Sequence, residues 1–463
     1  MDIQEVLSFV DELVFTKTGK HLSNLQVAIL REVWQGQKYF EIAEENYCSE
    51  GYVRNLASEL WQILSNAMAE NVNRTNFRSV MERKQSLIVS SNFFGSVGND
   101  LIISNVNVCR DISSDISSPS KSDKLQQNLS TAPDLVKLSD RQKEIANLEK
   151  WILREGCRLI AILGNSGIGK TALACYLLQK IKTNFDVVIW LDLNLSPPLE
   201  NTLKSLILST GNQTEDRLPS TLGEKLSILL SNLQKKRCLI VLDDVQTLLR
   251  EKQLAGNYQS EYRSYKKFFK LIGETVHKSC FIINSWESPQ EIITLAGKNS
   301  PVSLFPLKPL GLGASEILRE NKLLDESEWE KLINIYQGNP LWLKIAVNTI
   351  QEIFGGRVGE FFKYEQLYIS EELAIILEKH WQRLSEIEQK VITCLSQKME
   401  PLSIAQLLTD SQLSAQELFN AIKSLGRRFL IETKMQEQET LFSVLPIFRQ
   451  YVISNFEDLE KLH

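Results

Sequence analysis

A glycine-rich stretch at residues 164–171 has the composition and spacing of a loop that binds phosphate groups. It satisfies the pattern GxxxxGK[ST], with the residues Gly164, Asn165, Ser166, Gly167, Ile168, Gly169, Lys170 and Thr171. Its glycines allow backbone N–H groups to converge on phosphate oxygens, and the helix expected from Lys170 directs its positive dipole end at the anion. Lys170 would reach the β- and γ-phosphates, and Thr171 would offer a hydroxyl to Mg²⁺. The predicted cofactors are therefore ATP or ADP with Mg²⁺.

A second acidic centre follows the apolar run Leu239–Leu242, where two carboxylates end a predicted strand. This position places Asp243 beside the phosphate loop, where it can hold Mg²⁺ through the water shell of the ion. Asp244 is then the candidate for polarising an attacking water. The alternative is a pair of aspartates that only cap a turn. Together the two motifs predict nucleotide binding, and they favour at most a slow ATPase.

The elements that must position these residues form an α/β domain. Four apolar runs alternate with helical patterns, at residues 158–163, 187–191, 238–242 and 280–283. Near-continuous aliphatic and β-branched strands separated by helices are what a buried parallel sheet requires. We therefore expect a P-loop domain with a parallel sheet.

The rest of the chain predicts a multidomain α/β protein with helical parts on both sides of the P-loop domain. Residues 39–54 have helix–turn–helix form, with Ser49 as the N-cap of the second helix. The expected parts are a helix–turn–helix-like interaction domain (1–84), a Ser/Asn-rich linker with apolar residues that could dock part of it (85–132), the P-loop domain (133–300), a purely helical domain (301–368) and a winged helix of three helices and a hairpin (369–463).

Composition excludes several classes of function. The net charge of −5 does not favour nucleic acid, and no apolar run approaches the ~20 residues that cross a bilayer. The seven cysteines form no CxxC pair and the four histidines form no cluster, so we expect reduced thiols and no metal site built from histidine or cysteine. The acidic N-terminus lacks the features of a signal peptide, which predicts a cytoplasmic location.

From residue 133 onward the motifs resemble the NB-ARC branch of the signal-transduction (STAND) ATPases, which includes apoptosome scaffolds and plant immune receptors. The resemblance rests on the phosphate loop, the acidic strand, the Gly-Asn-Pro-Leu element at 338–341 and the winged helix. Residues 138–141 match the hydrophobic-x-Gly-Arg element of the family, with Asp140 where glycine is usual. The resemblance implies that Arg141 and Pro340 flank the base and sugar. It also implies that ADP keeps the domains closed and that ATP opens the molecule, so that it forms a homo-oligomer.

Two positions depart from the family pattern. Trp286 occupies the place of an arginine that senses the γ-phosphate, and Val444-Leu445-Pro446 replaces the Met-His-Asp that reads the ADP β-phosphate. A charged hydrogen bond contributes about 1.5–3 kcal/mol. Reversing a two-state population from 1:99 to 99:1 requires roughly 5.5 kcal/mol of differential affinity. We therefore expect nucleotide binding, and leave nucleotide-driven switching and turnover open.

The first 84 residues resemble the helix–turn–helix modules at the head of some bacterial members of this class. They carry 9 lysines and arginines against 12 acidic residues, which disfavours DNA because phosphate neutralisation dominates DNA affinity. We expect a protein effector or sensor as their partner, and no membrane. The winged helix ends its third helix with Arg427-Arg428, for which packing on the P-loop domain is favoured over DNA contact.

Three functional hypotheses follow. The first is a signalling switch, for example in bacterial defence or stress, that presents residues 1–84 to an effector. The alternatives are an ATP-gated DNA-binding transcription regulator and a nucleotide-binding scaffold without significant hydrolysis, which Trp286 favours. The sequence ends soon after the winged helix, so we expect the sensor of the trigger to be another polypeptide or the chain to be naturally short.

Overall fold

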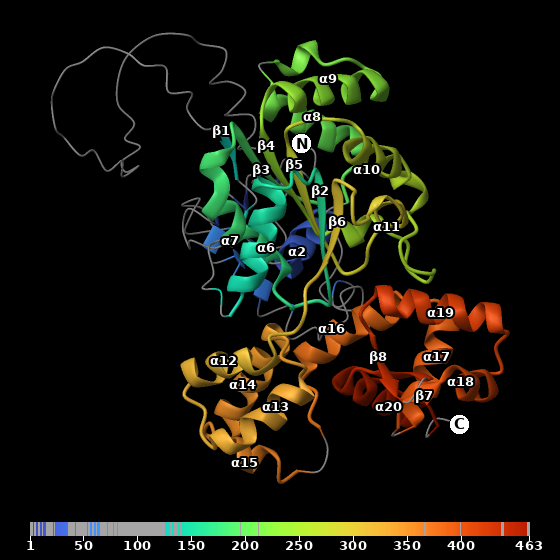
Figure 1. Ribbon diagram of the computed structural model, residues 1–463. Coiled ribbons are helices and arrows are strands. Elements are labelled where there is room, and N and C mark those ends of the chain that lie inside the picture. Colours follow the sequence, from blue (N-terminus) through green and yellow to red (C-terminus); the bar gives the residue numbers. More distant parts are fainter. Residues whose placement is uncertain are drawn as a thin grey trace. The chain divides into compact units, whose positions relative to one another are not determined.

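The computed structural model describes residues 140–460 apart from 195, 212, 365–366, 399 and 437–438, together with 126–129, 132–133, 138 and scattered positions between 3 and 81. The chain divides into two compact units, Met1–Ser117 and Ser118–His463 (Figure 1). Each unit is described by itself. Among the described residues, none of the helices combines the length and the apolar character needed to cross a bilayer.

The N-terminal unit contains helix α2 (Asn24–Gln35) and a small apolar core. Trp34 and Trp61 lie in this core against Phe77, with ring centroids 6.0 and 5.3 Å from it. Ile42 and Val53, one on each side of the predicted turn, are both fully buried. The turn itself, including Ser49, and the linker from residue 85 to 125 lie outside the described residues.

The second unit is built on a parallel six-stranded sheet with the order β1-β3-β4-β5-β2-β6. The strands are β1 (Gln126–Asn128), β2 (Leu159–Leu163), β3 (Val187–Asp192), β4 (Cys238–Asp243), β5 (Cys280–Ser285) and β6 (Val302–Pro306). The four predicted runs are therefore confirmed as its central strands, β2 to β5. Their parallel register brings the carboxyl ends of β2, β4 and β5 to one edge, where the phosphate loop begins.

Both edge strands differ from expectation. Residues 301–368 are not purely helical, because β6 pairs along its whole length with β2. Only Val302 of β6 is buried, so this strand lacks the continuous apolar run of the inner strands. In the predicted linker, the polar strand β1 pairs with β3 through main-chain bonds that require no apolar side chain. Edge strands of this kind leave little signal in sequence.

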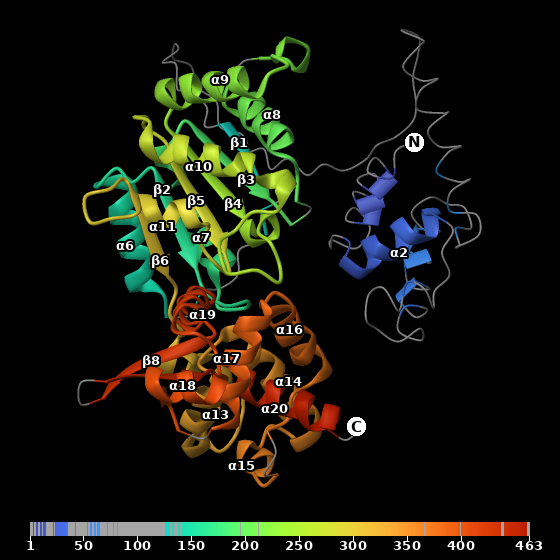
Figure 2. The same ribbon diagram turned by 90° about the vertical axis from the view of Figure 1, so that its right-hand side faces the viewer.

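Helices cover both faces of the sheet (Figures 1 and 2). One face packs against α6 (Gln142–Leu153) and α7 (Lys170–Ile181). The other face packs against α8 (Leu199–Thr210), α9 (Leu222–Lys235), α10 (Ser264–Glu274) and α11 (Gln290–Leu295). The aromatic residues Tyr265, Phe268 and Phe269 are buried in this second core, as the amphipathic pattern of α10 predicts.

Residues 311–460, here called the C-terminal part, form a helical layer with a small antiparallel sheet in the order β7-β9-β8. Its elements are α12 (Ser315–Glu320), α13 (Trp329–Ile335), α14 (Pro340–Phe354), α15 (Val358–Phe361), α16 (Glu371–Gln382), α17 (Glu386–Gln397), β7 (Leu402–Ser403), α18 (Ile404–Ser411), α19 (Ala415–Arg427), β8 (Ile431–Gln436), β9 (Glu439–Val444) and α20 (Pro446–Glu460). The predicted hairpin is present as β8 and β9, whereas the three helical patterns before it are four helices, α16 to α19.

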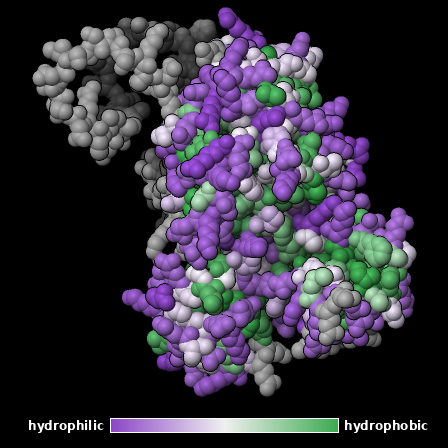
Figure 3. Space-filling view, viewed as in Figure 1, coloured by the Kyte–Doolittle hydropathy of each residue, from purple (hydrophilic) through white to green (hydrophobic). Residues whose placement is uncertain are grey.

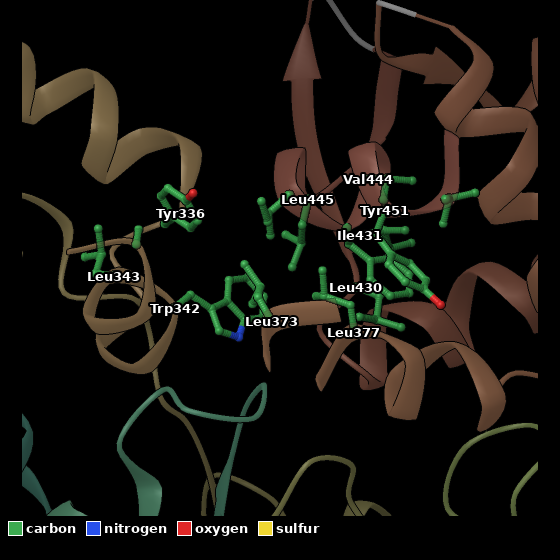
Figure 4. Packing of buried hydrophobic residues seen from close by; sticks show 14 of the residues in the cluster. Tyr336, Trp342, Leu343, Leu373, Leu377, Leu430, Ile431, Val444, Leu445 and Tyr451 are labelled. Carbon is green, nitrogen blue, oxygen red and sulfur yellow. The ribbon is translucent and has the colours of Figure 1, made fainter. Parts of the chain in front are cut away.

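A single hydrophobic core runs through the C-terminal part. In Figure 4, Trp342 of α14 lies next to Leu373 of α16, and Leu377 on the same helix lies by Leu430 near β8. Helix α16 therefore contacts α14 on one side and the segment before β8 on the other, within one core. On the face drawn in Figure 3, the Ser118–His463 unit is mostly hydrophilic, with hydrophobic residues grouped near α19.

Candidate functional site: the phosphate loop

The phosphate loop connects β2 to α7, and its backbone depends on glycine at two places. Gly169 is the N-cap of α7 with a φ of 100°, in the left-handed region that favours glycine. Gly167 has a φ of 77°, and a Cβ placed on it would lie 2.4 Å from Cβ of Leu341. Leu341 belongs to the C-terminal part, so Gly167 is required both for the turn and for this close approach.

Lys170 begins α7 and is almost fully buried, with 6% of its surface exposed. Its Nζ donates to the carbonyls of Gly164 and Asn165, both at 2.9 Å, which fixes the ammonium over the loop. Burial lowers the pKa of Lys170 to about 8, although Asp244 and Asp243 act in the opposite direction. The lysine is therefore mostly protonated at neutral pH, as a phosphate-binding lysine must be.

Thr171 and Asp243, the two residues predicted to hold Mg²⁺, lie within hydrogen-bond distance of each other. Oδ1 of Asp243 accepts hydrogen bonds from Oγ1 of Thr171 at 3.2 Å, Nδ2 of Asn284 at 3.0 Å and the backbone N of Asp244 at 3.1 Å. Burial, with a smaller contribution from Asp244, raises the pKa of Asp243 to about 6. A buried carboxylate with a raised pKa gains most from a nearby cation.

The donor set fits a hydrated Mg²⁺ next to bound phosphates. Mg²⁺ prefers oxygen ligands, and the hydroxyl and carboxylate are close enough to share one ion. Two further buried oxygens of the loop and of β5, Oδ1 of Asn165 and Oδ1 of Asn284, accept no hydrogen bond from the described residues. Each can accept a hydrogen bond from a bound ligand or from water.

Asp244 follows β4 in the left-handed conformation, with a φ of 56°. Its Oδ1 accepts a 2.7 Å hydrogen bond from Nε2 of Gln246, and Oε1 of Gln246 accepts from the backbone N of Trp286 at 3.2 Å. Gln246 thereby connects the end of β4 to the end of β5. Nothing in the sequence marked this glutamine, because its role depends on a contact across 40 residues.

Arg141 lies behind the loop, 4% exposed, just before α6. One guanidinium nitrogen donates to the carbonyl of Ile168 at 3.1 Å, and the other donates to the carbonyl of Lys308 at 2.8 Å and to Glu144 at 2.9 Å. Arg141 therefore supports the loop and the segment that leaves β6. Its predicted place beside the base and sugar of the nucleotide stays a prediction.

The C-terminal part touches the phosphate loop at two places. Two hydrogen bonds come from the start of α14. Nδ2 of Asn339 donates to the carbonyl of Ser166 at 2.9 Å, and the backbone N of Leu341 donates to the carbonyl of Gly167 at 3.3 Å. Before β8, the carbonyl of Phe429 accepts from Nδ2 of Asn165 at 3.0 Å. Pro340 occupies the first helical position of α14, between these contacts. The structure thus brings every predicted site residue to one edge of the sheet.

Comparison with known proteins agrees with this architecture. Residues 141–264 match the NB-ARC domain model, and residues 1–84 match the N-terminal helix–turn–helix of vWA-MoxR associated proteins. An uncharacterised WD repeat-containing protein of Nostoc sp. is 33% identical over 336 residues, which cover 69% of this chain and 26% of that protein. A disease resistance-like protein of Arabidopsis thaliana is 28% identical over 230 residues, covering 47% of this chain and 17% of that protein. The chain therefore spans about a quarter or less of the length of these curated relatives.

Among solved structures, a STAND protein with a tetratricopeptide repeat sensor from Pyrococcus horikoshii is 19% identical, with a TM-score of 0.37, over 70% of this chain and 43% of that one. A Walker-type ATPase of Pyrococcus abyssi is 15% identical, with a TM-score of 0.44, over 68% and 96% of the two chains. Sheet and phosphate loop define a P-loop nucleotide-binding protein. Within that class, the chain carries an NB-ARC domain at residues 141–264 and, at residues 1–84, a helix–turn–helix domain of the type found at the N-terminus of vWA-MoxR associated proteins.

Proposed function

We propose that the chain is a signalling switch that binds ATP or ADP with Mg²⁺ and changes the arrangement of its parts according to the nucleotide. One observation carries this proposal: the phosphate loop is hydrogen-bonded both to the start of α14 and to Phe429. A nucleotide that alters the loop therefore alters contacts to two places in the C-terminal part. ADP would stabilise the closed arrangement seen here, and ATP would favour an open form that oligomerises and presents residues 1–84 to a protein effector.

Each residue has a defined part in nucleotide binding. The loop amides and Lys170 bind the phosphates, while Thr171 and Asp243 hold Mg²⁺, which neutralises phosphate charge. Asp244 orients water, and Gln246 limits the freedom of its carboxylate through the 2.7 Å bond. A carboxylate bonded in this way is a weak general base, so we expect any hydrolysis of ATP to be slow.

The decisive experiment identifies any co-purified nucleotide and measures the molar mass by light scattering with ADP and with ATP. We expect a monomer with ADP and a larger species with ATP and Mg²⁺, because opening exposes surfaces that the closed form buries. An identical mass in both nucleotides, with binding shown by calorimetry, would contradict the switch and leave a nucleotide-binding scaffold.

Asp243→Asn should remove the benefit that Mg²⁺ gives to nucleotide affinity. We expect about a 10-fold or greater loss of affinity for ATP with Mg²⁺, since a hydrogen bond to a charged group contributes about 1.5–3 kcal/mol. Affinity without Mg²⁺ should change little. Asp192→Asn is the matched control, because Asp192 ends the neighbouring strand opposite Asp243 and its carboxylate accepts from Asn194 N at 2.8 Å. Equal losses in both variants would remove Asp243 from the metal site.

The scaffold without significant hydrolysis is the second candidate, favoured by Trp286 at the end of β5. An indole offers no positive charge for a γ-phosphate, whereas arginine would. Single-turnover hydrolysis of radiolabelled ATP separates the two functions: measurable phosphate release supports the switch, and none over hours supports the scaffold. The DNA-binding alternative predicts affinity for duplex DNA that falls steeply with salt.

A further inference from the structure

His380 of α16 is a buried polar side chain whose surroundings are unlike those of an ordinary core histidine. It is 4% exposed, and its ring lies against the indole of Trp286, with centroids 4.5 Å apart and planes inclined by 31°. Nε2 of His380 has no hydrogen-bond partner among the described residues. A buried polar atom without a partner costs about 1–3 kcal/mol, so it marks a place where a ligand can supply the missing bond.

His277, the other histidine that is buried among the described residues of this unit, shows the contrast. It precedes β5, at the opposite end of the strand from Trp286. Its Nε2 bonds the carbonyl of Ile272 at 3.0 Å, and its Nδ1 accepts from the backbone N of Ser279 at 3.2 Å. His277 is therefore satisfied by its own protein, and His380 is not.

The charges that act on His380 are all positive. They come from three elements: Lys170 at the phosphate loop, Arg383 just after α16, and Arg428 just after α19. Burial and these cations lower the pKa of His380 to about 3, so the imidazole is neutral. Glu287, the nearest described carboxylate along the chain from Trp286, is already paired with both arginines. Such positively charged surroundings favour an anionic ligand.

The location identifies which anion. Trp286 comes two residues after Asn284, whose amide bonds the metal-side carboxylate of Asp243 at 3.0 Å. The charge of Lys170, the residue expected to bind the β- and γ-phosphates, also acts on His380, so the imidazole lies on the side of the site where the terminal phosphate is expected. Resting on the proposed nucleotide function, we propose that His380 is a ligand of the terminal phosphate, held in place by stacking on Trp286.

Binding through Nε2 makes the affinity depend on protons. The phosphates bring several negative charges to a ring whose protonation is opposed by burial and by three cations, and a nearby opposite charge favours the charged imidazolium. The neutral ring of the free protein should therefore take up a proton when nucleotide binds. The hydrogen bond from His380 to the phosphate would also join α16 of the C-terminal part directly to the nucleotide.

His380→Phe tests the assignment, because it keeps an aromatic ring on Trp286 and removes the donor. We expect about a 10-fold or greater loss of affinity for ADP and for ATP in calorimetric titrations, corresponding to one charged hydrogen bond. His277→Gln is the matched control and should bind as the wild type does. Thermal unfolding of both variants checks that the fold is intact, and His380→Gln, which offers an amide donor, should recover part of the affinity.

The number of protons taken up on nucleotide binding tests the phosphate contact directly, because a histidine with only a packing role would not change this number. Titrations at pH 6.5 in buffers of different ionisation enthalpy should show more protons taken up by the wild type than by His380→Phe. Contributions from Lys170 and Asp243 are common to both proteins and cancel in this difference. Wild-type affinity, or unchanged proton uptake, in His380→Phe would overturn the inference while leaving the proposed function intact. Failure of the wild type itself to bind nucleotide would overturn both.

Discussion

Lys170→Ala should weaken the binding of ADP and ATP with Mg²⁺ by about 100-fold or more, the largest effect expected from a single substitution in this chain. The ammonium is the cation held closest over the loop, bonded to the carbonyls of Gly164 and Asn165. Each hydrogen bond from a charged group to phosphate contributes about 1.5–3 kcal/mol, and two such bonds account for the expected loss. Binding is measured by calorimetry or with a fluorescent nucleotide.

Lys180→Ala is the matched control for this substitution. Lys180 lies on the same helix, is 46% exposed, and pairs with Glu149 at 2.7 Å near the far end of α7. An exposed ion pair contributes about 0–1 kcal/mol to stability, so this variant should fold and bind nucleotide normally. Because Lys170 also bonds the loop carbonyls, thermal unfolding of Lys170→Ala must be compared with that of the wild type. Unchanged ADP affinity in a folded Lys170→Ala variant would refute the role of the lysine.

The residues that could be predicted from sequence are those whose signal is local. The central strands are short runs of aliphatic residues, and each of them lies within the predicted bounds or extends them by one or two residues. The phosphate loop and Asp243 are likewise readable, because parallel strands end at one edge of the sheet. For the central strands, the phosphate loop and Asp243, a short segment of sequence is enough to predict the structural element and where it lies in the sheet.

The contacts that decide how the parts fit together could not be read in this way. Gln246, His380 and Arg383 reach partners 40 or more residues away, and none belongs to a motif. Arg428 was visible in sequence as half of a basic pair that could contact phosphate. In the structure it is 4% exposed and pairs with Glu287 and Glu388, which confirms the packing interpretation.

These contacts form a chain from the nucleotide site to the C-terminal part. Asp244 accepts from Gln246, the side chain of Gln246 accepts from Trp286, and the main-chain carbonyl of Gln246 accepts from Arg383 at 3.1 Å. Arg383 then donates to Glu287 at 2.7 Å. Gln246 therefore links Asp244 to the ion pairs of Arg383 through these bonds, so the site and the closed arrangement are physically coupled.

Glu287→Gln should release the C-terminal part from the P-loop domain, because Glu287 neutralises two arginines of the C-terminal part. It is 1% exposed, with Arg383 at 2.7 Å and Arg428 at 3.1 Å. Removing one member of a buried ion pair costs about 3–5 kcal/mol, since the remaining charges stay buried and uncompensated. Only Glu388 would then face Arg428 directly, at 3.0 Å. We expect faster hydrogen–deuterium exchange at residues 245–256 and 424–430, and a larger ATP-induced mass in light scattering.

Glu251→Gln is the control that distinguishes the loss of the buried Glu287 ion pairs from the loss of any negative charge near Arg383. Glu251 pairs with the same arginine at 3.3 Å, but its side chain is 61% exposed. Water compensates an exposed charge, so this variant should keep wild-type exchange. In Glu287→Gln, Arg383 and Arg428 still donate to the main-chain carbonyls of Gln246 and Gln253. The P-loop domain itself should therefore stay folded and keep its exchange protection at β2 and β4. Wild-type exchange across the interface in Glu287→Gln would show that the phosphate-loop contacts alone keep the two parts closed.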